Sequence, residues 1–273
     1  MKEQRTWCEN PCGKKSFAIL INDYNSFVAS TAEDHAMSFF TRVACNAEEQ
    51  RRMLDVVQST GMKEIGFGVT TAKHTFNVKR GSSCPPDCWP STSHSSSDDG
   101  CAFPVATLAC FDFLESVCSR ACGVLQGVSH EEGMRMLNSN GALGTPPDGL
   151  SASMSQCFYY FNTPALEDHP NCGEHVDQGF LSIAPATATP GLEVFAFDTE
   201  EWIQIDKLVE RADLILFASE TLQRHSDQYR GTIHRVGKAA EPRLSMVYKL
   251  RHRAIEELED SNSIYVHYND RNI

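Results

Sequence analysis

The sequence predicts an α+β fold in which N-terminal helices support a mainly β core. Before residue 155, several segments repeat apolar residues every three to four positions, the period of an amphipathic helix. From 155 to 250 the chain has short apolar runs rich in Phe, Val and Ile, divided by Pro, Gly and Asp, which is typical of strands and turns. We see no internal repeat. We therefore divide the chain into an N-terminal region (1–154), a β core (155–250) and a C-terminal tail (251–273).

Local signals place the helices of the N-terminal region. Ser30-Thr31-Ala32-Glu33 and Asn46-Ala47-Glu48-Glu49 each set a polar capping residue three positions before a glutamate, the pattern of a capping box. We expect one helix to begin at each box, with the second ending near Gly61. Apolar spacing predicts a third helix at about 104–127. The Ser- and Asp-rich stretch 91–100 before it is expected to be a mobile loop.

Charge and hydropathy narrow the class of protein. The 273 residues include 24 basic and 36 acidic side chains, a net charge of −12 that repels phosphate backbones and argues against a nucleic-acid partner. We find no run that approaches the ~18 apolar residues of a membrane span, so no membrane association is expected. The apolar run Phe17–Ile21 is too short for a secretory signal. We expect a cytoplasmic protein whose oligomeric state is open.

The eleven cysteines are expected to be reduced thiols, as is usual for a chain without a secretory signal. Two pairs, Cys84/Cys88 and Cys118/Cys122, have the closeness of zinc ligands. Prolines interrupt the first pair, and the second falls on a helical pattern, where the small apolar side chain of Cys usually belongs to the core. We therefore expect no zinc site at either pair.

A candidate metal site begins with His175 and Asp177, in the segment Gly173-Glu174-His175-Val176-Asp177. Residues i and i+2 of an extended strand point the same way, roughly 6.6 Å apart, so both side chains could hold one ion. Taken alone, this pair is more typical of a surface strand with solvated side chains. His234 can supply a third ligand. Two histidines and one carboxylate on one face of a metal describe the non-haem Fe(II) oxygenase site.

A second motif follows in Arg243-Leu244-Ser245. On a strand, Arg243 and Ser245 share a face, and a planar guanidinium beside a hydroxyl suits the two-pronged binding of a carboxylate. An edge-strand arginine on the surface is the alternative for either residue taken singly.

Together these motifs resemble the isopenicillin N synthase-like family of Fe(II)/2-oxoglutarate dioxygenases. The segment 173–183 is similar to the family's ligand strand, and Pro190-Gly191-Leu192-Glu193-Val194 followed by Trp202 resembles its hairpin. Tyr159-Tyr160 resembles its Asn-Tyr-Tyr strand, although Phe158 stands at the Asn position. The likeness is fainter upstream, where 17–23 and 64–69 resemble early strands and the stretch before Trp89-Pro90 is short.

The resemblance implies a double-stranded β-helix (jelly roll) at 155–250, buttressed by the N-terminal helices. It implies that His175, Asp177 and His234 hold Fe(II), and that Arg243, Ser245 and Tyr160 bind 2-oxoglutarate. The implied reaction hydroxylates or otherwise oxidises a small molecule with O2, while 2-oxoglutarate is decarboxylated to succinate and ascorbate serves as an optional reductant. The resemblance does not identify the substrate.

Two alternatives remain open. One is an Fe(II) oxidase of the same fold that does not use 2-oxoglutarate, since such relatives also carry Arg-x-Ser; the other is a binding protein that kept the fold and lost turnover. A DNA-repair dioxygenase is disfavoured because Lys249 stands where those proteins have a second arginine. Finally, the low apolar content of 79–100 predicts a mobile segment that closes over the iron when substrate binds.

Overall fold

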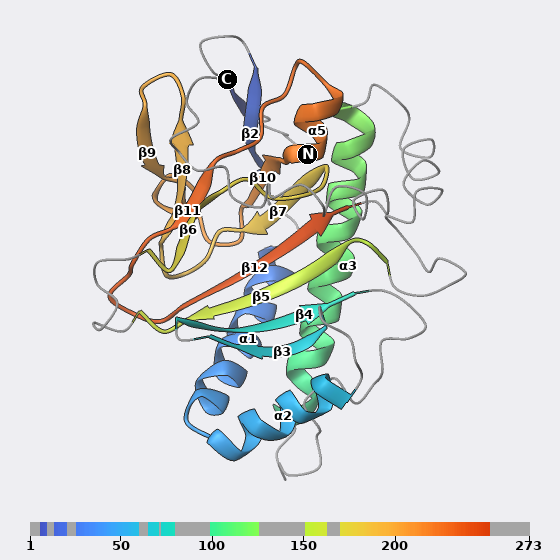
Figure 1. Ribbon diagram of the computed structural model, residues 1–273, viewed down its shortest axis with the longest axis vertical. Helices are drawn as coiled ribbons and strands as arrows, with labels where there is room; N and C mark the ends of the chain where they lie inside the picture. The colour runs from blue at the N-terminus through green and yellow to red at the C-terminus, as the bar shows by residue number, and fades with distance from the viewer. Residues whose placement is uncertain are drawn as a thin grey trace.

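The short strands of the chain form two antiparallel sheets, accompanied by three long helices (Figure 1). A computed structural model describes residues 6–9, 14–20, 26–59, 65–70, 72–79, 99–125, 151–162 and 170–251. Its helices are α1 (Ser26–Ala44), α2 (Ala47–Ser59), α3 (Asp99–Leu125) and the short α5 (Glu220–His225), with one 3-10 turn, η4 (Ile205–Lys207). Its strands are β1 (Thr6–Glu9), β2 (Lys15–Leu20), β3 (Gly66–Val69), β4 (Lys73–Val78), β5 (Met154–Tyr160), β6 (Cys172–His175), β7 (Leu181–Pro185), β8 (Leu192–Ala196), β9 (Glu201–Gln204), β10 (Leu214–Ala218), β11 (His234–Val236) and β12 (Arg243–Leu250).

The larger sheet, sheet A, has the strand order β1-β2-β10-β7-β12-β5-β4-β3, and the smaller one, sheet B, has the order β6-β11-β8-β9. At the centre of sheet A, β12 pairs with β5, so that Arg243 lies opposite Tyr160 and Lys249 lies opposite Met154. Because side chains alternate across a strand, this register decides which residues face the helices and which face sheet B.

The outer face of sheet A is apolar and packs against α1 and α3, which run behind it in Figure 1. From β12, Leu244, Met246 and Tyr248 point to this side and are buried. Phe111 of α3 meets the Tyr248 ring edge-on, with the ring centroids 5.4 Å apart. Burial of such side chains, worth roughly 1.5–3 kcal/mol each, fixes the register of β12.

The opposite side of sheet A, which we call the inner face, turns toward sheet B. Phe17, Phe217 and Val247 from this face share one apolar cluster with Leu192 and Val194 of β8. The apolar contact closes one part of the space between the sheets. Beyond this contact, the inner positions of β12 are polar and hold Arg243, Ser245 and Lys249.

The structure corrects several expected boundaries. Helix α1 begins at Ser26, so the box at 30–33 lies inside it, and α3 begins at Asp99 rather than 104. The start of α2 was expected correctly: the amide of Glu49 donates to Asn46 Oδ1 over 3.0 Å.

Strand β4 was not predicted from the sequence. Because β2, β3 and β4 belong to sheet A, the region before residue 155 also supplies part of the β structure.

Helix α3 also corrects the expectation about apolar segments. Its part Ala102–Leu125 is long and apolar enough to cross a membrane by length and composition alone. This is weak evidence, since the core helix of a soluble protein passes the same test. On this helix Leu114 is fully buried. Cys118 is also fully buried and Cys122 nearly so, as expected for thiols that belong to the core rather than bind zinc.

Several expectations fall on residues outside the described part of the chain. They include Trp89-Pro90, the Cys84/Cys88 pair, the tail beyond residue 251, and the mobile segment 79–100 except for its two ends.

Candidate metal centre

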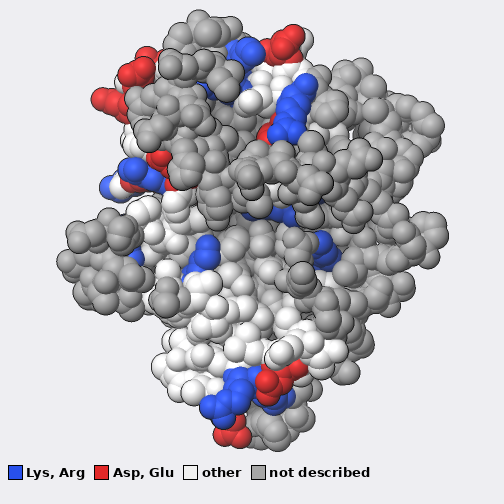
Figure 2. Space-filling model, viewed as in Figure 1, with Lys and Arg blue, Asp and Glu red and all other residues white. Residues whose placement is uncertain are grey.

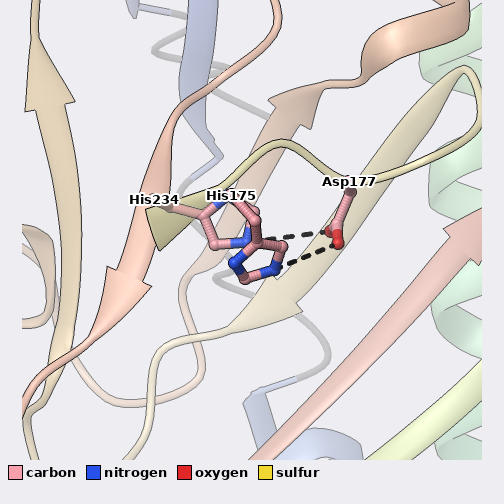
Figure 3. Close-up of side chains that lie close together, drawn as sticks. All are labelled: His175, Asp177 and His234. Carbon is pink, nitrogen blue, oxygen red and sulfur yellow. Dashed lines mark ion pairs between the residues drawn. The ribbon is translucent and has the colours of Figure 1, made fainter. Parts of the chain in front are cut away.

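Three side chains converge where β6, at one edge of sheet B, pairs with β11. The ligand atoms of His175, Asp177 and His234, called the triad below, lie within 4.8 Å of one another. His175 Nε2 is 3.6 Å from Asp177 Oδ1, and His234 Nε2 is 3.9 Å from Asp177 Oδ2 (Figure 3). The three groups point toward a common centre, as the sequence predicts.

The way the chain brings them together differs from the prediction. Strand β6 ends at His175, so Asp177 lies in the following loop instead of two positions along the same strand. His234 arrives by cross-strand pairing, because it is the residue of β11 opposite His175. Pairing across the sheet therefore joins the two histidines, and the loop turns the carboxylate toward them.

Two glycines permit that loop. Gly179 has φ +106°, and a Cβ there would lie 2.5 Å from the carbonyl oxygen of Leu250. Gly231 lets the segment before β11 approach the loop, since a Cβ there would lie 2.6 Å from Val176 Cγ1. The first turn of α5 holds the loop from the other side, where the amide of Glu220 donates to the carbonyl of Asp177 over 2.9 Å.

The histidines are arranged as metal ligands. His175 Nδ1 lies 2.9 Å from the carbonyl oxygen of Gly173, and His234 Nδ1 lies 3.0 Å from that of Thr232. A carbonyl only accepts hydrogen bonds, so each Nδ1 carries the proton and each Nε2 is directed to the centre. Metal-bound histidines almost always have this outer partner, which fixes the ring. The donor set of the triad fits a divalent transition metal, Fe(II) among them.

Asp177 is held ionised by its neighbours. Its side chain is 3% exposed, and Lys249 Nζ donates to Oδ1 over 2.6 Å. Burial opposes the charged form, but the Lys249 ammonium and the two imidazoles hold the pKa of Asp177 well below its usual range. Burial lowers the pKa of His234 to about 4. Against the same burial, the hydrogen bond to Asp177 raises the pKa of His175 to about 10.

A second group lies deeper, at the start of β12. The Arg243 side chain is 1% exposed; its Nη2 lies 3.2 Å from Asp206 Oδ2, and its Nε donates to the carbonyl of Thr189 over 3.1 Å. Its Nη1 is buried and has no hydrogen-bond partner among the described residues. A Cβ on Gly191 would lie 2.9 Å from Arg243 Cδ, so this glycine leaves room for the guanidinium. The orphaned donor fits a bound carboxylate.

The other two residues predicted to bind the co-substrate lie on the same inner face. Tyr160 is directly across from Arg243, and Ser245 is across from Phe158. Tyr160 is buried, and burial raises the pKa of its phenol above the usual range. It therefore stays neutral and able to donate a hydrogen bond. The register thus brings Arg243, Ser245 and Tyr160 together.

Three residues of this region were not predicted as parts of the site. They are Lys249, which pairs with Asp177; Asp206, which holds Arg243; and Lys73 of β4, which lies over aromatic rings of β5. Lys249 could have been predicted, because side chains alternate along β12 and Lys249 therefore shares a face with Arg243 and Ser245. Asp206 follows β9 in a separate hairpin, and its distance in sequence hid the contact.

No family model matches the chain, and no curated protein matches it significantly. Solved structures do. A full-length Neurospora crassa protein in complex with alpha-KG matches with a TM-score of 0.64 at 18% identity, over 87% of this chain and 75% of that one. JOX2 in complex with 2OG, Fe and JA matches with 0.62 at 16%, over 94% and 72%. A Caulobacter crescentus protein assigned to the 2OG-Fe(II) oxygenase family matches with 0.60 at 20%, over 87% and 78%. At these identities the likeness concerns the fold alone: the chain has the fold of solved 2OG-Fe(II) oxygenases.

Proposed function

We propose that the protein is a non-haem Fe(II)/2-oxoglutarate-dependent oxygenase that oxidises a small molecule. We assign it to the isopenicillin N synthase-like group, with the two sheets forming a double-stranded β-helix. The observation that carries the proposal is the triad, whose imidazoles are each fixed through Nδ1 and directed through Nε2 to one centre. The fold agrees, because solved proteins that share it were crystallised with 2-oxoglutarate and iron.

Each residue of the site has a distinct task in this proposal. His175, Asp177 and His234 would hold the metal, and a set of three protein ligands would leave coordination positions open to 2-oxoglutarate and O2. Bound Fe(II) supplies the redox chemistry by which O2 oxidises substrate while 2-oxoglutarate is decarboxylated to succinate. Arg243 donates from Nη1 to the distal carboxylate of 2-oxoglutarate, assisted by the hydroxyls of Tyr160 and Ser245. The apolar cluster of the inner face excludes water from that carboxylate, which strengthens the interaction.

One observation favours a second candidate, an Fe(II) oxidase of the same fold that does not use 2-oxoglutarate. Asp206 already neutralises the guanidinium of Arg243, and both side chains are 1% exposed. A neutralised arginine attracts a dianion less than a free one does. The orphaned Nη1 supports the first candidate over this one. The intact triad counts against a binding protein without turnover.

Succinate release distinguishes the candidates. Purified protein is incubated with Fe(II), ascorbate and 2-oxoglutarate, without added substrate, and succinate is quantified. We expect slow uncoupled turnover that Asp177→Asn, a nearly isosteric change, reduces at least a hundredfold. Arg243→Met should weaken 2-oxoglutarate binding by roughly ten- to a hundredfold, the loss of a charge-assisted hydrogen bond. Metal binding without any succinate, and unaffected by Arg243→Met, would select the oxidase.

A further inference from the structure

Lys73 is a cation on the inner face of sheet A. It stands at the start of β4, directly across from Tyr160. Its Nζ lies 4.8 Å from the ring centroid of Phe158 and 5.3 Å from that of Tyr160. The side chain is half-buried, and no carboxylate among the described residues forms an ion pair with it.

The two rings position the ammonium without neutralising it. Phe158 and Tyr160 are stacked, with centroids 6.1 Å apart, so they offer Lys73 a continuous aromatic surface. A cation held over such rings is attracted to their electron-rich faces but acquires no counter-charge. A half-buried ammonium in this state attracts an anion more strongly than an exposed surface lysine does, because the surrounding protein screens it less.

The charges near the triad leave this cation unbalanced. Arg243 pairs with Asp206, and Lys249 pairs with Asp177, so each of these two pairs is neutral. A divalent metal and a 2-oxoglutarate dianion also cancel. Among the described inner-face residues of β4, β5 and β12, the positive charge that remains belongs to Lys73. Although the chain as a whole is acidic, the described charged side chains in the middle of the face shown in Figure 2 are basic.

We propose that Lys73 binds the single anionic group, a carboxylate, of the substrate, which makes the enzyme selective for small monocarboxylic acids. The inference rests on the proposed function, because the charge balance includes the metal and 2-oxoglutarate. Lys73 lies one strand away from Tyr160, and the two rows of side chains share a face. Tyr160 in turn lies across from Arg243, so Lys73 borders the residues proposed to bind 2-oxoglutarate.

The test measures the binding of matched probes to the loaded protein. Cobalt(II) replaces iron so that no turnover occurs, and 2-oxoglutarate is present at saturation. Phenylacetate and hexanoate are compared with their neutral amides, phenylacetamide and hexanamide, by the paramagnetic relaxation of the probe protons. We expect each acid to bind at least about tenfold more tightly than its amide in the parent protein. Lys73→Met and Lys73→Gln should remove that preference, and Lys73→Arg should retain it.

The control variant is Arg120→Met, which removes one positive charge from an exposed position on α3, on the helix side of sheet A. It should leave the preference unchanged. Equal binding of acid and amide by the parent, or a preference that survives both neutral variants, would overturn the inference. So would a lower 2-oxoglutarate affinity of Lys73→Met with the acid preference intact, because Lys73 would then serve the co-substrate. Failure of the parent to bind cobalt, or of 2-oxoglutarate to change the cobalt spectrum, would instead overturn the proposed function.

Discussion

Lys249 and a metal ion compete for the same carboxylate. The ammonium lies 2.6 Å from Asp177 Oδ1 and supplies the charge that a buried carboxylate needs. A bound divalent ion supplies that charge as well. The stability of the protein without metal therefore depends on Lys249 more than the stability of the loaded protein does.

Lys249→Met tests this dependence. Without metal, we expect the variant to lose about 3 kcal/mol of unfolding free energy, because Asp177 keeps only His175 and His234 as partners. Cobalt(II) should then raise the melting temperature of the variant more than that of the parent. Thermal melts with cobalt and with a chelator measure both effects, and Lys207→Met, at an exposed position, is the control. Equal cobalt-induced shifts in variant and parent would show that Lys249 does not stabilise the site in the absence of metal.

His74 predicts a pH dependence that is separate from the triad. It is 3% exposed and lies against the rings of Phe67 and Phe161, and its Nδ1 has no hydrogen-bond partner among the described residues. Burial lowers its pKa from 6.5. The unfolded chain therefore binds a proton more readily, and stability should fall as the pH drops below about 6.5.

The variant His74→Phe removes this contribution while keeping an aromatic side chain. Urea unfolding between pH 5 and 8 should give a smaller loss of stability for the variant than for the parent at the acid end. His234, whose pKa is also lowered, contributes a slope of the same sign to both proteins. Identical slopes would mean that His74 does not titrate in this range.

The position of Asp177 depends on Gly179, in the same loop between β6 and β7. Its φ of +106° is rarely adopted by other residues, and an added Cβ would lie 2.5 Å from a carbonyl oxygen of β12. We expect Gly179→Ala to destabilise the fold by more than about 1–2 kcal/mol and to weaken cobalt binding at least tenfold. Gly173→Ala is the matched control, since nothing lies within 4 Å of its added Cβ. Calorimetric titration with cobalt compares them; equal affinity would show that the loop tolerates the displacement.

The elements show why sequence reasoning succeeded in some places and failed in others. Asn46 caps α2 through a bond between neighbours in the sequence, so the motif alone could predict that helix start. At α1 the apolar residues Ala29 and Ala32 pack in the core and extend the helix back to Ser26, beyond the apparent box. Strand β4 escaped notice because its inner positions are polar, Lys73 among them, and only the paired strands explain that alternation.

The residue types of the candidate site could be predicted from sequence motifs, but the positions that depend on loop conformation could not. His175, Asp177 and His234 were recognised from their types and order, and the structure brings them together. The predicted placement of Asp177 on the same strand as His175 was wrong, because β6 ends at His175 and Asp177 lies in the loop that follows. Asp206 could not be expected, because only the folding of the β8–β9 hairpin places it against Arg243.

For the whole molecule, the sheet pairings predict that the β core is not independent of what precedes it. Strand β2 pairs with β10, and β4 pairs with β5. Removal of residues 1–150 would expose those edges and the apolar side of Phe217. We expect the fragment 151–273 to lack a cooperative melt and to aggregate, whereas the full chain unfolds cooperatively. A soluble fragment with sharp amide resonances would establish an autonomous core.

The alternation along β12 limits how this protein can vary in evolution. Leu244, Met246 and Tyr248 serve the helix side, while Arg243, Ser245 and Lys249 serve the site. Insertion or deletion of one residue within the strand would exchange the two sets, burying charge among the helices and turning apolar groups to the ligands. Viable descendants can therefore replace residues one for one along β12, but they can gain or lose length only between strands. Changes of substrate range by altered length belong to the connecting segments.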